Sequence, residues 1–152
     1  IRPYKPGDED ALVRVFRRAV FEMASSKYQE PQIRAWLTCG PTSASPRDDI
    51  LNRDGFVAIG GGEILGWIEL FEDSHIDRFY CVPEVCGKGV ADDLYAAALD
   101  WAQSRGIKRL YCEASLFAES FFGRHGWSVD GRETVVCEGI EIECARMSVV
   151  CG

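Results

Sequence analysis

The stretch FYCVPEVCGKGVADDLYAAALDWAQSRG, residues 79–106, combines three signals in a fixed order. It opens with a short apolar run, continues through a lysine held between Gly87 and Gly89, and closes with apolar residues at helical spacing up to Gly106. This order predicts a strand, a glycine loop and a long helix over 88–105. Amides at a helix start point outward and glycines let them approach an anion closely. The loop is therefore either a phosphate cradle or a simple tight turn.

Two nucleotide-binding loops are excluded by spacing. A P-loop requires Ser or Thr directly after its lysine and an earlier glycine, whereas Gly89 follows Lys88 and Val82 stands in the place of that glycine. A dinucleotide-binding fingerprint requires a small residue where Asp92 stands. Any phosphate site on this loop therefore belongs to another class.

Outward from this stretch, the chain changes repeatedly between helical and strand periodicity. Helices are predicted over 7–25, 30–40 and from Ser45, and strands over 1–6, 56–60, 64–71, 75–82, 109–114, 127–136 and 140–149, with a short helix over 118–125. This order predicts an α+β (α/β sandwich) fold. We expect a mixed, mostly antiparallel central sheet of six to seven strands flanked by helices on both faces.

Length and charge narrow the function classes. The 152 residues predict one domain over 1–152, with 47% hydrophobic and 27% charged residues as in an ordinary globular protein. The net charge of −7 argues against a nucleic-acid partner, which would require a basic face. No apolar run approaches the length of a membrane span and no signal-peptide core is present, so we expect no membrane partner.

Cysteine usage indicates the compartment. There are seven cysteines and two histidines, with no Cys-x-x-Cys pair, which fits neither a zinc site nor a disulfide framework. Most of the cysteines stand in apolar strand patterns, where a free thiol behaves as a small buried hydrophobe. The sequence therefore predicts free thiols, a cytoplasmic location and no metal.

The loop and its surroundings resemble the GNAT superfamily of acetyl-CoA-dependent N-acetyltransferases over essentially the whole chain. The family pattern Arg/Gln-x-x-Gly-x-Gly/Ala corresponds to CGKGVA, residues 86–91. It is preceded by FYCVPE and followed by the long helix, by KRLYCEAS and by AESFFGRHGW, in family order. The resemblance implies the GNAT acyl-CoA acyltransferase fold and acetyl-CoA as co-substrate.

The resemblance also implies a cofactor site. Backbone amides of the loop would bind the pyrophosphate, the preceding strand edge would pair with the pantetheine chain, and a further group would line the opposite wall. These three groups are, in order, Gly87, Lys88, Gly89, Val90 and Ala91; Tyr80, Cys81 and Val82; and Ser115, Phe121, Phe122 and Arg124. Cys86 departs from the Arg or Gln of the family. Phe122 replaces the tyrosine that protonates the departing thiolate in many relatives, so that proton must come from another group or from water.

Acetyl transfer needs a neutral amine and a proton for the leaving sulfur. Asp77 in HIDRFYCV is our candidate base or amine anchor, or else a strand-edge charge paired with Arg78. A GNAT subgroup with Tyr-Ser-Pro-x-Gln-Ile-x-x-Trp resembles this chain at KYQEPQIRAWL, which adds Tyr28 and Trp36 as acceptor-site residues. Tyr28 is the candidate acid, with packing as its alternative role. Glu69 would reach the same cleft from the adjacent strand, or else face solvent.

The sequence thus predicts an N-acetyltransferase that moves an acetyl group from acetyl-CoA directly to an amine of a small molecule or peptide. Two alternatives stay open. One is a non-catalytic acyl-CoA-binding or sensor domain, which the substitutions at Cys86 and Phe122 favour. The other is a GNAT enzyme that uses a longer acyl-CoA. Many relatives dimerise, so a homodimer is a further expectation, and the acceptor cannot be read from the sequence.

Overall fold

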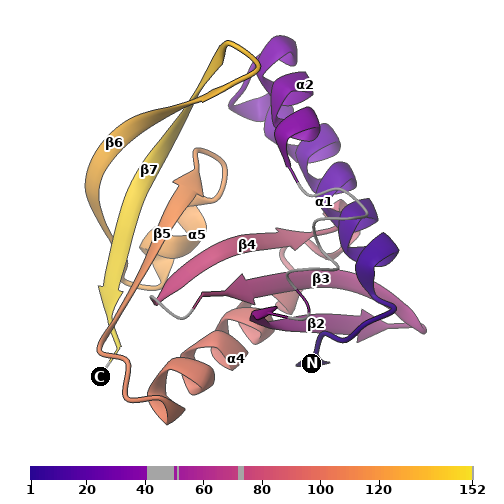
Figure 1. The fold of residues 1–152 in the computed structure, drawn as a ribbon, viewed down its shortest axis with the longest axis vertical. Coiled ribbons are helices and arrows are strands. Elements are labelled where there is room, and N and C mark those ends of the chain that lie inside the picture. Colours follow the sequence, from indigo (N-terminus) through magenta and orange to yellow (C-terminus); the bar gives the residue numbers. More distant parts are fainter. Residues whose placement is uncertain (41–49, 51, 72–73, 152) are drawn as a thin grey trace.

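The structure is a computed structural model, and it describes residues 1–40, 50, 52–71 and 74–151 (Figure 1). Seven strands form one sheet in the order β1-β2-β3-β4-β5-β7-β6. They are β1 (Arg2–Pro3), β2 (Asp54–Gly60), β3 (Glu63–Leu70), β4 (His75–Cys81), β5 (Arg109–Ser115), β6 (Ser128–Cys137) and β7 (Ile140–Val150). Every pairing is antiparallel except β4 with β5. The prediction of an α+β fold with a mixed, mostly antiparallel sheet is confirmed.

Helices cover both faces of this sheet, as Figure 1 shows. They are α1 (Glu9–Met23), α2 (Glu30–Cys39), α4 (Val90–Ser104) and α5 (Glu119–Arg124), with short 3-10 turns at Ala24–Ser26 and Pro83–Val85. Successive strand residues point to opposite faces. Trp67 accordingly packs in the core under α1, and Ile68 packs in the core against α4. The helix predicted from Ser45 lies largely outside the described residues.

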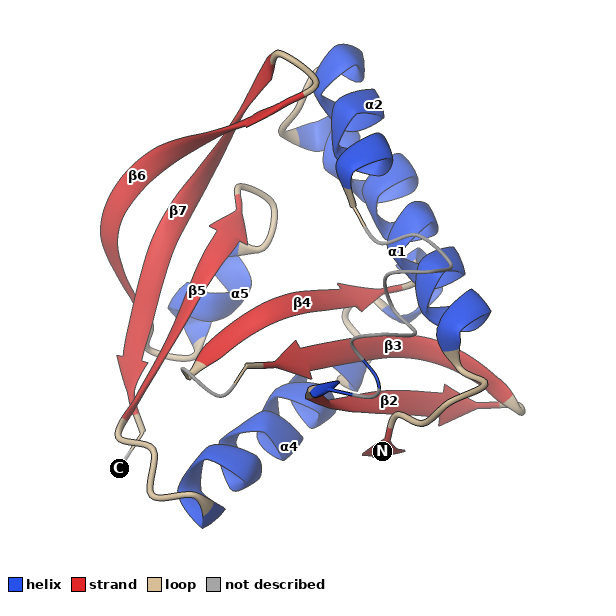
Figure 2. Cartoon of the chain, viewed as in Figure 1, coloured by secondary structure: helices blue, strands red, loops and turns tan. Residues whose placement is uncertain are grey.

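The sheet opens between its two central strands. β4 and β5 pair only at His75 with Tyr111 and at Ile76 with Cys112. Beyond these pairs the two strands diverge, and Figure 2 shows β5 running away from β4 toward the β6–β7 hairpin. We call this opening the splay. The splay leaves one edge of β4 without a neighbouring strand, where a bound molecule can reach the backbone.

A β-bulge lies at the root of the splay. Glu69 on β3 pairs with Arg78, and the next residue, Leu70, pairs with Ile76, so Asp77 is the extra residue on β4. A bulge interrupts the alternation of side chains and re-aims those beside it. As a result, Asp77 and Arg78 both lie near Glu69, although they are neighbours along one strand.

One cysteine prediction is wrong. Cys39, the last residue of α2, and Cys137, the last residue of β6, form a disulfide across a sequence separation of 98. Spacing along the chain could not reveal this pair, because only the packing of α2 on the β6–β7 hairpin brings it together. The remaining cysteines are free thiols: Cys81, Cys86, Cys112, Cys144 and Cys151.

None of the helices in the described part of the chain is long and apolar enough to cross a membrane.

Candidate functional site

A first cavity of about 210 Å³ lies on one side of the splay, and we call it the loop cavity. It is enclosed by α1, β4, the glycine loop and α5. The predicted cofactor-site residues that line it are Tyr80, Cys81, Gly87, Gly89, Ala91, Phe121, Phe122 and Arg124. Val82, Lys88 and Val90 do not appear in this lining, and Val82 is buried in the core under α1.

The glycine loop presents free amides to this cavity. Gly87 and Gly89 have φ angles of 74° and 86°, the left-handed conformation that glycine adopts without strain. The Lys88 amide donates to the Val85 carbonyl at 3.1 Å, so it closes the turn. Among the described residues, none accepts a hydrogen bond from the amides of Gly87, Gly89, Val90 and Ala91. These donors at the positive end of α4 fit an anionic group such as a pyrophosphate.

Among the described residues that line this cavity, the one acidic residue is Asp92, which contacts His125 and Arg124. His125 Nε2 lies 2.7 Å from Asp92 Oδ1, and Arg124 Nη2 lies 3.1 Å from the same oxygen. The hydrogen bond with His125, supported by Arg124, holds the pKa of Asp92 below its ordinary value. The carboxylate is thereby paired with the Arg124 guanidinium and opposes an anion at the loop less than an unpaired one would.

The free edge of β4 faces the splay beside the loop cavity. The Val82 amide donates to the Leu65 carbonyl of the β3 side at 2.9 Å. Peptide groups alternate along an antiparallel strand, so those of Phe79 and Cys81 are directed to the opposite side, into the splay. Burial raises the pKa of the Cys81 thiol to about 12, which keeps it neutral. The edge therefore offers backbone groups to a ligand and no thiolate.

A second cavity of about 310 Å³ lies on the other side of the splay, and we call it the acceptor cavity. α2, β4, β5, β6 and β7 contribute to its wall. Its lining residues include Tyr28, Trp36, Asp77, Arg78, Tyr80, Glu113, Ser115, Val135 and Ile142, together with Cys39 and Cys137 of the disulfide. Ser115, which the resemblance assigned to the cofactor wall, therefore lies on this side instead.

The two cavities converge within the splay. A small cavity of about 60 Å³ lies between them and shares lining residues with each, and we call it the junction cavity. Asp77 and Glu113 line both it and the acceptor cavity, whereas Phe79 and Phe122 line both it and the loop cavity. Tyr80 contributes to all three linings. Two molecules held in these cavities would thus meet beside Tyr80.

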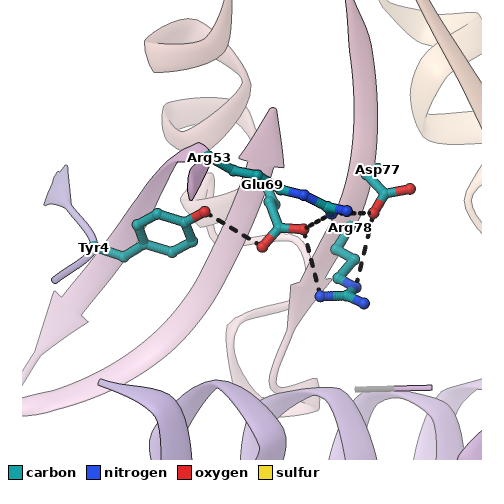
Figure 3. A network of polar contacts seen from close by, with 5 residues as sticks. All are labelled: Tyr4, Arg53, Glu69, Asp77 and Arg78. Carbon is teal, nitrogen blue, oxygen red and sulfur yellow. Dashed lines mark hydrogen bonds and ion pairs between the residues drawn. The ribbon is translucent and has the colours of Figure 1, made fainter. Parts of the chain in front are cut away.

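Asp77 belongs to an ionic network beside the acceptor cavity, which Asp77 and Arg78 line (Figure 3). The Arg53 guanidinium bridges two carboxylates, with Nη1 at 2.8 Å from Asp77 Oδ2 and at 2.6 Å from Glu69 Oε1. Arg78 adds contacts at 3.4 Å to Glu69 and at 3.9 Å to Asp77. The side chain of Asp77 is 35% exposed. Asp77 is therefore paired with arginines and also lines the cavity.

Glu69 lies deeper in this network. Its side chain is 0% exposed, so the solvent-facing alternative is wrong, and Tyr4 donates a hydrogen bond to it at 3.3 Å. It is absent from the linings of the three cavities formed by described residues. The structure thus brings Glu69 to the arginines beside Asp77 and not to the cavity surface.

The Tyr28 hydroxyl is engaged by the backbone on two sides. It donates to the Glu143 carbonyl at 2.6 Å and accepts from the Leu116 amide at 2.8 Å. Burial raises the pKa of Tyr28 above its ordinary value. Its ring packs edge-on against Trp36 with centroids 5.5 Å apart. Tyr28 therefore joins β7 to the segment after β5 and also forms part of the acceptor-cavity wall.

Phe122 is buried among aromatic rings, including Phe79 and Trp127 at centroid distances of 6.0 and 4.8 Å. It offers no proton to the loop cavity, in which the resemblance would place an acid.

Two features were not predicted as parts of the acceptor site: the position of the Tyr80 ring, and the carboxylate of Glu113. Glu113 occupies an exposed alternate position on β5, which from the sequence alone resembles an ordinary solvent-facing residue.

No group of three or more His, Cys, Asp or Glu side chains suited to a metal ion occurs among the described residues.

Comparisons with known proteins agree with this arrangement. A family model described as an acetyltransferase (GNAT) domain matches residues 24–148. The chain is 31% identical over 139 residues to the uncharacterized N-acetyltransferase YafP of Escherichia coli (strain K12), with 91% of this chain and 87% of that protein covered.

Solved structures show the same fold. The GCN5-related N-acetyltransferase "Aminotransferase, Class-II" from Rhodopseudomonas palustris superposes with a TM-score of 0.93 at 27% identity, covering 98% of this chain and 93% of that one. The PaiA N-acetyltransferase of Thermoplasma acidophilum, solved in complex with coenzyme A, gives a TM-score of 0.74 at 17% identity, covering 97% and 95%. With the matching family model and this fold, the chain belongs to the GNAT acetyltransferase family.

Proposed function

We propose that this chain is an N-acetyltransferase that transfers an acetyl group from acetyl-CoA directly to an amine of a small molecule or peptide. The observation that carries the proposal is the convergence of two cavities at Tyr80. One cavity lies beside a loop of free amides, and the other carries carboxylates. A direct transfer between two substrates needs a separate binding place for each, with the two places adjoining. Holding both reactants in position in this way supplies much of the rate.

Acetyl-CoA would supply an activated acyl group with a thiol as leaving group. The amides of Gly87, Gly89, Val90 and Ala91 would bind its pyrophosphate. The peptide groups of Phe79 and Cys81 would pair with its pantetheine chain along the free edge of β4. The coenzyme A complex of the Thermoplasma acidophilum protein, which shares this fold, supports this assignment.

The proton transfers would belong to the acceptor cavity. Asp77 would take the proton of the attacking amine, directly or through water, or hold the amine in place. Glu69 would position the arginines beside Asp77 instead of contacting substrate. Tyr28 would have to leave the Glu143 carbonyl in order to act as an acid, and Trp36 would form the wall beside it.

The binding-only alternative rests on Phe122, which has no hydroxyl to protonate the thiolate. A chain of that kind would bind acetyl-CoA and release no thiol in the presence of any amine. The second alternative, a GNAT enzyme that uses a longer acyl-CoA, would bind its co-substrate in the same loop cavity. The experiment below tests both alternatives.

The location and the oligomeric state predicted from the sequence stay predictions. A cytoplasmic location would keep the five free thiols reduced, whereas the Cys39–Cys137 bond is the observation that argues against a reducing compartment. A homodimer is a family expectation only.

The test is the release of coenzyme A thiol from acetyl-, propionyl- and succinyl-CoA, measured with a panel of amines and without any amine. Amine-dependent release that is fastest with acetyl-CoA would support the proposal. Binding of acetyl-CoA without amine-dependent release would overturn it in favour of the sensor.

A further inference from the structure

Glu113 is the carboxylate of the acceptor cavity that no sequence signal identified. It lies on β5, across the splay from Asp77 on β4, and both side chains also line the junction cavity. The Glu113 side chain is 47% exposed. Among the described residues its one ionic partner is His75, whose Nε2 lies 3.6 Å from Oε1 and which carries charge only when protonated.

Among the described residues, the other charged side chains of this wall form a network of opposite signs. Glu69 and Asp77 contribute two negative charges to the network of Figure 3, and Arg53 and Arg78 contribute two positive ones. Asp77 therefore adds little net field to the cavity.

Glu113 has no arginine or lysine at ion-pair distance among the described residues. Arg146, which lies opposite it in the β5–β7 register, pairs with Glu133 instead. The charge of Glu113 is available to a ligand.

The surroundings of Glu113 favour a cation with an apolar body. The rings of Tyr28, Trp36 and Tyr80 and the side chains of Val135 and Ile142 line the same cavity. Aromatic rings attract cations, and the apolar side chains offer a surface to the carbon chain of a ligand. An anionic acceptor would meet the same carboxylate unfavourably.

We propose that the acceptor is a small diamine, whose far ammonium group binds Glu113 while its near amine attacks the thioester beside Asp77. The inference rests on the proposed function and names the substrate class of that same site. The near nitrogen forms a bond to the acetyl carbon, and the carbon–sulfur bond breaks. The nitrogen loses one proton through Asp77, and the departing sulfur gains one, so the products are a monoacetylated diamine and coenzyme A thiol. The far ammonium keeps its charge throughout.

The experiment compares three acceptors with acetyl-CoA: a straight-chain diamine, the amino alcohol of equal length, and a neutral α-amino acid. Each is tested with the parent chain, with Glu113→Gln and with Glu63→Gln. The last variant is the matched control, because it removes an exposed carboxylate at the start of β3, outside the cavity linings. Melting temperatures and acetyl-CoA binding of all variants are measured alongside.

The expected result is a preference of the parent for the diamine, through a KM about tenfold or more below that of the amino alcohol, as the loss of one charge-assisted hydrogen bond would give. Glu113→Gln should raise KM for the diamine to that of the amino alcohol and leave kcat and the amino alcohol unchanged. Glu63→Gln should change neither.

Three results would overturn the diamine assignment: equal use of diamine and amino alcohol, preference for the amino acid, or an equal effect of Glu113→Gln on all acceptors. None of these results would contradict the proposed acetyltransferase activity. Thiol release with none of the amines would overturn the proposed function together with it.

Discussion

Asp77 on β4 and Glu113 on β5 line the same cavity from the two strands that stop pairing one residue before Asp77. Their environments differ. Asp77 is held by Arg53 and Arg78, whereas Glu113 has no arginine or lysine at ion-pair distance among the described residues, and its one partner there is His75. Two carboxylates in one site can take different roles when their surroundings differ. We assign proton transfer or amine anchoring to Asp77 and recognition of a second charge to Glu113.

Replacing Asp77 with Asn should lower kcat by about a hundredfold or more, the usual contribution of a general base. Acetyl-CoA affinity should not change, because Asp77 does not line the loop cavity. Steady-state kinetics and calorimetry measure the two quantities separately. Asp100→Asn, on the exposed side of α4, is the control. Unchanged kcat in Asp77→Asn would remove this residue from the mechanism.

Replacing Glu69 with Ala should reduce the free energy of unfolding by about 3 to 5 kcal/mol, as is typical when one partner of a buried ion pair is removed. The change leaves Arg53 and Arg78 without the carboxylate that lies between them. Urea denaturation followed by tryptophan fluorescence measures the loss. Glu63→Ala, at an exposed strand end, should cost far less. Similar losses in the two variants would contradict the structural role of Glu69.

Reduction of the Cys39–Cys137 bond, or the change Cys39→Ser, should lower the free energy of unfolding by about 2 to 4 kcal/mol. The bond closes a long loop, with a sequence separation of 98, and so restricts the unfolded chain. The melting temperature with and without reductant measures the effect, and mass spectrometry of alkylated protein counts the free thiols. Cys151→Ser, which changes a free cysteine, serves as the comparison. A melting temperature that is the same with and without reductant would contradict a stabilising role of this disulfide.

Asp8 should make stability depend on pH on the acid side. Burial alone would raise the pKa of Asp8, but the hydrogen bonds from Arg2 and from the Lys5 amide outweigh it, and the pKa lies below its ordinary value. A carboxyl with a lowered folded-state pKa stabilises the fold above its unfolded pKa of about 4, and this contribution is lost as pH falls through the folded pKa.

The measurement for Asp8 is the free energy of unfolding from pH 7 down to about pH 2 in the parent and in Asp8→Asn. The variant should be less stable at neutral pH and should lose less stability on acidification. Parallel curves would show that the Arg2–Asp8 contact does not stabilise the fold.

The elements and the glycine loop could be predicted because their signals are local. The periodicity of residues 90–104, the glycines around Lys88 and the turn at Glu138 and Gly139 each specify their own backbone. The matching order of these segments then implied the family.

The remaining parts depend on tertiary contacts. The bulge at Asp77 arises from the register of β4 against β3, and the Cys39–Cys137 pair arises from α2 resting on the β6–β7 hairpin. Glu113 could not be predicted as a site residue, because an exposed alternate position on a strand does not indicate which cavity the side chain faces.

Calorimetric titration tests most directly whether acetyl-CoA binds at the glycine loop, as we propose. The parent chain and Gly89→Glu are titrated with acetyl-CoA, since glutamate would place a side chain and a negative charge among the amides at a position with a φ of 86°. Binding by the parent, with at least tenfold weaker binding by a variant whose far-ultraviolet spectrum is unchanged, is the predicted result. Equal affinity in the two proteins, or no binding by the parent, would contradict it.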